Sequence, residues 1–268
     1  MSKTIAISGL GWLGVPLAHS LSNLGFQIKG SVTSEEKARM MSSQGIDTYA
    51  VEISEEGIRG EVTPFLQDVS ILIVLIPPGI RRNTGADFVQ KMSNLLSVVE
   101  KTQIDKVILV SSTSVYGDCQ GPVTEKDDPK PSTIVGEQLL QVEALFRNSQ
   151  KINLSIVRFG GLFGGNREPV RYLAGRKNLI DGNAPVNLIH RDDCIAILTE
   201  IIKQNAFGFT FNAVIPKHPI KREYYTQKAI ALNLTPPHYS DEVTDSNYKQ
   251  VNSENIATVL NYSFKHLF

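Results

Sequence analysis

Short runs rich in β-branched residues alternate with longer segments of helical period over most of this chain. Consecutive parallel strands need a crossover, usually a helix, and such helices cover both faces of the sheet. The alternation therefore predicts an α/β fold with a doubly wound parallel sheet of about seven strands. The predicted strands are residues 4–8, 26–32, 47–51, 71–75, 106–111, 154–159 and 209–212. The predicted helices are residues 12–24, 34–43, 86–100, 133–148, 192–204 and 222–232.

The first predicted strand runs directly into a glycine-rich turn, which reads Gly-Leu-Gly-Trp-Leu-Gly over residues 9–14. Gly9 permits a tight turn, Gly11 permits close approach of the backbone to a pyrophosphate, and Gly14 permits close helix–strand packing. The free N–H groups and positive dipole end of the following helix favour phosphate. In a Rossmann-type sheet the motif predicts a dinucleotide site formed by Gly9, Gly11, Trp12, Leu13 and Gly14. A strand-to-helix turn without a ligand is the alternative.

The end of the second predicted strand bears on the choice between NAD and NADP. An NAD site has an Asp or Glu there, which accepts hydrogen bonds from the ribose 2′-hydroxyl. Hydroxyl and basic side chains stand in this region instead: Ser31, Thr33, Ser34, Lys37 and Arg39. The sequence therefore predicts a preference for NADP over NAD, with Ser31, Thr33 and Ser34 as cofactor contacts. A plain helix N-cap is the alternative, because two glutamates follow Ser34 in the first helical turn.

The strand predicted at 106–111 ends in a hydroxyl cluster, which reads Ser-Ser-Thr-Ser-Val-Tyr-Gly over residues 111–117. This segment resembles the extended short-chain dehydrogenase/reductase family, the NAD-dependent epimerases and dehydratases that act on nucleotide sugars. The resemblance implies a cofactor contact at Ser111 and a catalytic hydroxyl at Ser112, four residues before Tyr116. A hydroxyl that only satisfies loop amides is the alternative for Ser112.

Four later segments are similar to motifs of the same family, in the same order. They are an Arg–Gly segment at 158–164, an Ile-His-Arg-Asp-Asp sequence at 189–193, a Gly-Phe-Thr-Phe-Asn strand at 208–212, and residues 249–262. The last of these resembles the family's final helix. With the serine strand they extend the resemblance over most of the chain.

One departure from the family pattern changes the functional expectation. The family's acid/base Tyr and its Lys partner form a Tyr-Gly-x-x-Lys sequence on the helix after the serine strand, and Val135 and Leu139 occupy those positions here. Neither side chain exchanges a proton, and no tyrosine lies between Tyr116 and Tyr172. Any activity then needs a substitute proton donor or acceptor. The nearest phenol is Tyr116, whose alternative role is packing below the small lobe.

The later part of the chain predicts that small lobe. A glycine-rich stretch at 160–165 and a polar segment up to 187 interrupt the alternation, and prolines cluster from residue 216 onward. We expect a dinucleotide-binding core from residues 1–165, to which residues 191–214 return, and a substrate lobe from residues 166–190 and 215–268. Open α/β sheets bind ligands over the carboxyl ends of their strands, where such a lobe would lie.

Composition narrows the partners and the compartment. The chain has 27 basic and 27 acidic side chains, so no basic field predicts a nucleic-acid or membrane surface. Its longest apolar run, residues 71–76, is far shorter than the roughly 20 residues that span a bilayer. Two cysteines far apart favour a reducing, cytoplasmic location. Five histidines without metal-ligand spacing predict no metal site.

These observations predict an NAD(P)-binding protein that resembles nucleotide-sugar epimerases, dehydratases and reductases. Its partner would be a small-molecule substrate such as a nucleotide sugar, and the resemblance permits a homodimer. Two other classes stay open. A non-catalytic NAD(P)-binding or sensing module would bind cofactor without turnover. A hydroxyacid dehydrogenase similar to 6-phosphogluconate dehydrogenase has a similar start, but needs a long all-helical second half with a catalytic lysine.

Overall fold

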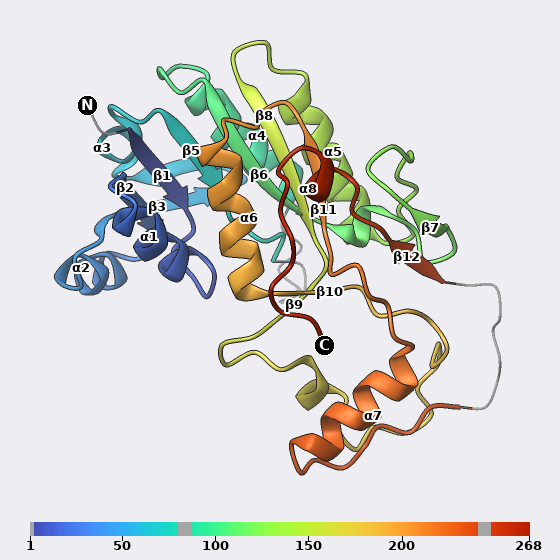
Figure 1. Cartoon of the computed structure of the whole chain (residues 1–268). Coiled ribbons are helices and arrows are strands. Elements are labelled where there is room, and N and C mark those ends of the chain that lie inside the picture. Colours follow the sequence, from blue (N-terminus) through green and yellow to red (C-terminus); the bar gives the residue numbers. More distant parts are fainter. Residues whose placement is uncertain (1–2, 80–86, 241–247) are drawn as a thin grey trace. The chain divides into compact units, whose positions relative to one another are not determined.

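The computed structural model describes residues 3–79, 87–240 and 248–268 (Figure 1). Strands of its main sheet hydrogen-bond in the order β11-β8-β6-β5-β1-β2-β3-β4. Their bounds are Thr4–Ser8 (β1), Gln27–Val32 (β2), Asp47–Ser54 (β3), Gly57–Gly60 (β4), Ile71–Val74 (β5), Lys106–Ser112 (β6), Asn153–Phe159 (β8) and Thr210–Ala213 (β11). Strand β1 pairs in parallel with both β2 and β5, which confirms the predicted Rossmann-type sheet.

The sheet has 8 strands rather than about seven, because β4 adds an antiparallel edge to β3. Strand β4 reads Gly-Ile-Arg-Gly, which carries little strand signal by itself. Its pairing depends on Gly60, whose φ is +92°. A Cβ at Gly60 would collide with the carbonyl oxygen of Ala50 on β3, so the close approach requires glycine there.

Six of the described helices match the predicted ones, with ends that shift by a residue or two, whereas the short helices α3 and α8 were not predicted. The described helices are Gly14–Asn23 (α1), Glu35–Ser43 (α2), Val62–Leu66 (α3), Phe88–Val99 (α4), Ile134–Arg147 (α5), Arg191–Lys203 (α6), Lys221–Ala231 (α7) and Asn255–Thr258 (α8). Ala86, where the third predicted helix starts, lies outside the described residues. Helix α4 begins after Asp87, whose side chain accepts a hydrogen bond from the backbone N–H of Gln90 and caps the helix.

The end of the chain corrects the expectation of a final helix over residues 249–262. Lys249–Val251 forms β12, which pairs in parallel with β7 (Gly121–Val123), and α8 is a single short turn. The Glu125 carboxylate accepts hydrogen bonds from the backbone N–H groups of Glu254, at 3.0 Å, and Asn255, at 3.3 Å. These contacts satisfy amides at the start of α8, so the helix begins there and not at Lys249.

Two compact units divide the chain. Unit 1 contains Met1–Ser111, Glu137–Val157 and Leu198–Thr210. Its centre is the parallel sheet, in which every residue of β1 and β5 is buried. Helix α1 contributes Leu17 and Leu21, which have no exposed surface. Central strands buried on both faces are typical of parallel sheets covered by helices.

Unit 2 contains Ser112–Gly136, Arg158–Ile197 and Phe211–Phe268. A parallel pair, β9 (Gly161–Phe163) and β10 (Leu188–His190), lies in it. The apolar cluster of this unit is Phe163, Val186, Leu188, Ile215 and Tyr224, with Tyr225, Phe264 and Phe268 packed against it. The lobe boundaries that the sequence predicts, 166–190 and 215–268, stay a prediction.

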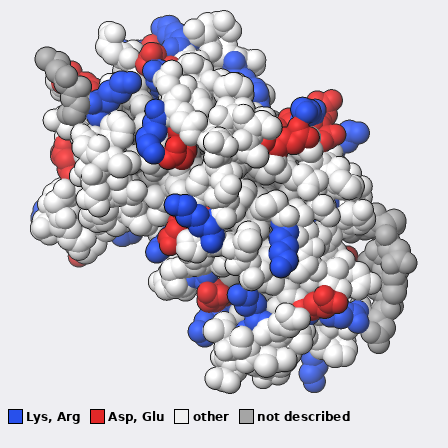
Figure 2. Space-filling view, viewed as in Figure 1, with Lys and Arg blue, Asp and Glu red and all other residues white. Residues whose placement is uncertain are grey.

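Charged side chains of both signs are scattered over the face drawn in Figure 2. Among the residues that the structure describes, no helix has the length and apolar character to cross a membrane.

Candidate functional site

The glycine-rich turn joins β1 to α1 as the sequence predicts. Gly9 has a φ of +110°, and its carbonyl oxygen accepts a hydrogen bond from the backbone N–H of Gly11 at 3.0 Å. A Cβ at Gly14 would collide with that same carbonyl oxygen, so the start of α1 packs directly onto the turn. Gly14 is therefore required by packing inside the protein.

Gly11 has a different reason to be glycine. It is exposed, and a Cβ built there meets no described atom within 4 Å. Its φ is not in the left-handed region that favours glycine. Neither packing nor backbone geometry accounts for glycine at this position, and the close approach of a phosphate that the motif predicts stays a prediction. The flanking Trp12 is half-buried and Leu13 is buried, so the exposed edge of the turn is its backbone.

The hydroxyl side chains after β2 differ in their access to solvent. Thr33 and Ser34 are exposed, whereas Ser31 is 4% exposed. The Ser34 hydroxyl accepts a hydrogen bond from the backbone N–H of Lys37 at 3.4 Å, so the helix-cap role is present. That bond occupies one lone pair and leaves the O–H available to donate. Arg39 is paired with Glu35 at 3.1 Å, whereas no described carboxylate pairs with the exposed Lys37.

Ser111 and Ser112 at the end of β6 have separate environments. Ser111 is 6% exposed and donates to Oε1 of Glu143 at 2.6 Å, a carboxylate that is 1% exposed. Ser112 is half-buried, and its hydroxyl oxygen accepts from the backbone N–H of Ser114 at 3.2 Å, where it caps a short 3₁₀ turn. The loop-capping role considered for Ser112 is therefore present, and its O–H proton is still available to donate.

Tyr116 has no exposed surface, and its hydroxyl has protein partners in several directions. The hydroxyl oxygen accepts from Nη1 of Arg158 at 2.7 Å. Its proton faces two acceptors, the Thr124 carbonyl oxygen at 2.8 Å and Oδ1 of Asn212 at 3.1 Å. Burial raises the pKa of Tyr116, and the Arg158 charge and the Asn212 hydrogen bond only partly oppose that shift. These contacts favour the packing role over proton transfer, because a general base must reach its substrate.

Asn212 is itself fixed by two further contacts. Its Nδ2 donates to the carbonyl oxygen of Asn252 at 3.1 Å, and its backbone N–H donates to Oε1 of Glu125 at 2.8 Å. The amide group therefore directs Oδ1 toward Tyr116. Sequence reasoning identified Tyr116 but missed this network, since its members are far apart in the sequence and nothing local marks their association.

Helix α5, which carries Val135 and Leu139, begins close to the 3₁₀ turn after Ser112. A Cβ at Gly136 would collide with the carbonyl oxygen of Ser114, so glycine permits this approach. Val135 is half-buried and Leu139 is 5% exposed. Neither of these two side chains carries a group that titrates, so neither supplies a proton.

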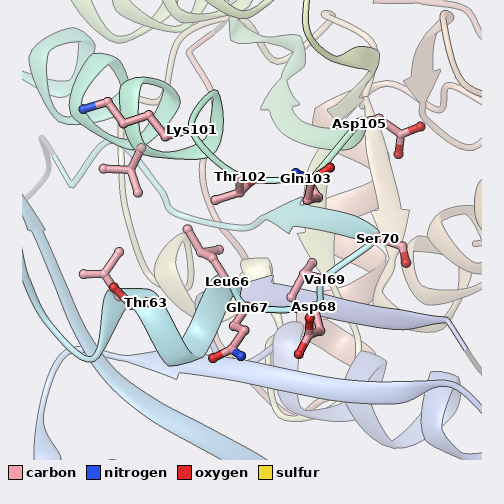
Figure 3. A pocket seen from close by; sticks show the side chains of 12 residues that line it. Thr63, Leu66, Gln67, Asp68, Val69, Ser70, Lys101, Thr102, Gln103 and Asp105 are labelled. Carbon is pink, nitrogen blue, oxygen red and sulfur yellow. The ribbon is translucent and has the colours of Figure 1, made fainter.

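A cavity of about 780 Å³ lies in unit 1 away from the glycine-rich turn (Figure 3). Its lining includes Leu66 of α3, Lys101 after α4, Ser70 immediately before β5, and Asp105 immediately before β6. The cavity is therefore at the amino ends of these strands, whereas Gly9 follows the carboxyl end of β1. Because Rossmann-type sheets bind ligands at their carboxyl ends, the cavity is not part of the candidate cofactor site.

The comparisons with known proteins agree with this fold. Residues 9–205 match the family model described as "NAD(P)H-binding". The chain belongs to the NAD(P)H-binding family. A similar protein is YeeZ of Escherichia coli (strain K12), which is 33% identical over 267 residues and covers 98% of this chain and 96% of its own length.

Two solved structures have the same fold as this member of the NAD(P)H-binding family. UDP-glucuronic acid 4-epimerase from Bacillus cereus, in complex with NAD, has a TM-score of 0.79 at 18% identity and covers 98% of this chain and 92% of that one. MoeE5, in complex with UDP-glucuronic acid and NAD, has a TM-score of 0.78 at 17% identity and covers 98% and 94%. At these identities the two structures show that the chain has the same fold.

Proposed function

We propose that the protein binds NADP in preference to NAD. The observation that carries the proposal is the end of β2, where Thr33 and Ser34 are exposed and residues 29–34 contain no Asp or Glu. A carboxylate there would accept a hydrogen bond from a free 2′-hydroxyl and repel a 2′-phosphate, so its absence favours NADP. Because Ser31 is buried, Thr33, Ser34 and Lys37 carry the proposed phosphate contacts.

The glycine-rich turn would hold the pyrophosphate. The exposed backbone at Gly11 and the N–H groups at the start of α1 donate hydrogen bonds without a side chain in the way. Trp12 and Leu13 contribute backbone and packing there, and Ser111, held by Glu143, supports the end of β6. When bound, the cofactor supplies a carbon that accepts or donates hydride.

We also propose a small-molecule substrate of the nucleotide-sugar class, handled without the family's usual proton transfer. Ser112 has an O–H available to orient a substrate oxygen, but an unassisted hydroxyl has too high a pKa to be a ready base. Val135 and Leu139 supply no proton. Tyr116 as the substitute stays a prediction, and its buried, fully engaged hydroxyl supports a structural role instead.

The second candidate is a cofactor-binding or sensing module without turnover. The burial of Tyr116 favours this second candidate. Tyr116 is the phenol nearest to the serine strand, and it has no exposed surface. Calorimetric titration with NADPH and NADH, followed by assays with a panel of nucleotide sugars and carbonyl compounds, separates the candidates.

We expect NADPH to bind about tenfold or more tightly than NADH, the equivalent of one charge-assisted hydrogen bond to the 2′-phosphate. Tighter binding of NADH would overturn the cofactor preference. Cofactor binding without any turnover would support the sensing module, and turnover would exclude it.

We further propose that the protein is cytoplasmic and forms a homodimer, with neither nucleic acid nor membrane as a partner. Cys119 is exposed and Cys194 is buried, and both are free thiols, which suits a reducing compartment. Light scattering on the purified chain tests the dimer, and a monomeric mass at micromolar concentration would contradict it.

A further inference from the structure

Two histidines and one aspartate converge in unit 2 at the start of α6. His190 ends β10, Asp192 is in the first turn of α6, and His266 is near the end of the chain. The Asp192 Oδ2 atom is 3.8 Å from Nδ1 of His190 and 3.8 Å from Nε2 of His266. One ligand atom from each residue lies within 4.8 Å of the others. We propose that these three side chains bind a divalent transition-metal ion of the Zn²⁺ type.

The His190 ring is held on several sides. The ring of Phe163 meets it edge-on with centroids 5.1 Å apart, and the ring of His266 stacks on it at 4.0 Å. Gly164, with a φ of +97°, brings the chain so close that a Cβ there would collide with the imidazole. The side chain of His190 is 16% exposed as a result. Its orientation is thus fixed before any ligand arrives.

His266 is positioned through Asp193, the residue after the proposed ligand Asp192. The Asp193 carboxylate is fully buried and accepts from the Tyr262 hydroxyl at 2.6 Å and from the backbone N–H groups of Lys265 at 2.9 Å and His266 at 3.1 Å. The C-terminal segment is therefore tied to the same turn of α6 that carries Asp192. Supporting contacts of this kind are what a preorganised site needs.

The donor set determines the class of metal. Two imidazole nitrogens and one carboxylate oxygen suit Zn²⁺, Ni²⁺ or Cu²⁺, whereas Mg²⁺ and Ca²⁺ prefer oxygen ligands alone. Bonds of about 2.1 Å in a tetrahedral site separate neighbouring ligand atoms by about 3.4 Å. The 3.8 Å spacings of Asp192 need a small contraction. Because imidazole lone pairs lie in the ring planes, the His266 ring must also rotate out of its stack on His190 to point at a shared ion. Its side chain is 49% exposed and that of His266 is 42% exposed, so both have room to move.

Two features oppose the ion, and each is limited. The backbone N–H of Asp192 faces Nδ1 of His190 at 3.2 Å, so metal binding must displace one long hydrogen bond. The positive dipole end of α6 disfavours a cation, but Asp192 and Asp193 in the first turn offset it. The Nε atom of Arg191 is 3.6 Å from Oδ1 of Asp192. The other carboxylate oxygen, Oδ2, is the one nearest to the rings of His190 and His266.

The test is calorimetric titration of the tag-free full chain with ZnCl₂ and, separately, MgCl₂. We expect one Zn²⁺ per chain and no saturable binding of Mg²⁺. The variant His266→Phe keeps an aromatic ring that can stack on His190 and removes one ligand, so its affinity for Zn²⁺ should fall about tenfold or more. The matched control His238→Phe removes an exposed imidazole that is not one of the three proposed ligands, and it should leave the affinity for Zn²⁺ unchanged.

Co²⁺ provides a second readout, because a tetrahedral site with imidazole ligands gives strong visible absorption that scattered surface histidines do not. Absence of saturable Zn²⁺ binding by the wild-type chain, or equal binding by His266→Phe, would overturn the proposal. If circular dichroism shows that His266→Phe is unfolded, Asp192→Asn serves as the variant, with the same expected loss. Cofactor titration of the same samples reports on the proposed function separately.

Discussion

Substitution Tyr116→Phe distinguishes a structural tyrosine from a catalytic one. It removes a hydrogen bond from Arg158, which is 3% exposed, and one shared between Thr124 and Asn212. A bond from a charged donor contributes about 1.5–3 kcal/mol and a neutral one about 0.5–1.5 kcal/mol. We therefore expect the free energy of unfolding of unit 2 to fall by about 2–4.5 kcal/mol, with little change in cofactor affinity.

Because the chain has two compact units, one global transition cannot be assumed. Hydrogen exchange of peptides covering residues 112–124 and 211–215 reports on the network directly, and denaturant unfolding gives the overall effect. Tyr49→Phe is the matched control, since its hydroxyl donates to Asp47 in an exposed hydrogen bond and should contribute less than about 1 kcal/mol. If Tyr116→Phe leaves hydrogen exchange unchanged but abolishes turnover, the structural role of Tyr116 is refuted. Tyr116 would then be the substitute acid or base.

Three further results are expected. Gly14→Ala should destabilise unit 1 by about 1–3 kcal/mol in denaturant unfolding, since its Cβ meets the Gly9 carbonyl oxygen, whereas Gly11→Ala should keep stability and weaken NADPH binding in calorimetry. Thr33→Asp should reverse the cofactor preference in the same titration, because the new carboxylate repels a 2′-phosphate and accepts from a 2′-hydroxyl. Burial lowers the pKa of His218, although the Val186 carbonyl and Asn252 partly oppose it. The unfolded chain then binds the proton first, so unfolding free energy should decline as pH drops below about 6.5, with a weaker slope in His218→Gln.

Features with a local cause were predictable from the sequence. Strands such as β1 and helices such as α2 follow from periodicity and capping, and the turn at Gly9 follows from glycine spacing. Strands β4 and β12 were not predictable, because their short sequences become strands only through partners that the fold supplies. The absence of an Asp or Glu at the end of β2 was also visible in the sequence, because it depends only on residues 29–34.

The candidate site was predictable only where its chemistry is local. Ser112 and Tyr116 were visible in the sequence at 111–117. The hydrogen bonds that hold the Tyr116 hydroxyl come from Arg158 and Asn212, which lie on two other strands. His190 and Asp192 were visible in the 189–193 sequence, but their association with His266 was not. Spacing rules detect ligands on one helix or hairpin, whereas here the last ligand comes from the C-terminal segment.

Leu139, at the position where the family resemblance implies a lysine, is part of the packed face of α5. Leu139, Val142 and Phe146 are at most 5% exposed and follow one another at helical spacing, so position 139 belongs to the apolar stripe of unit 1. A lysine at that place would have its ammonium group desolvated, which is costly without a charged partner. Leu139 is thus a core residue, and a lysine there would require repacking around α5. One face of α5 therefore stabilises the core of unit 1.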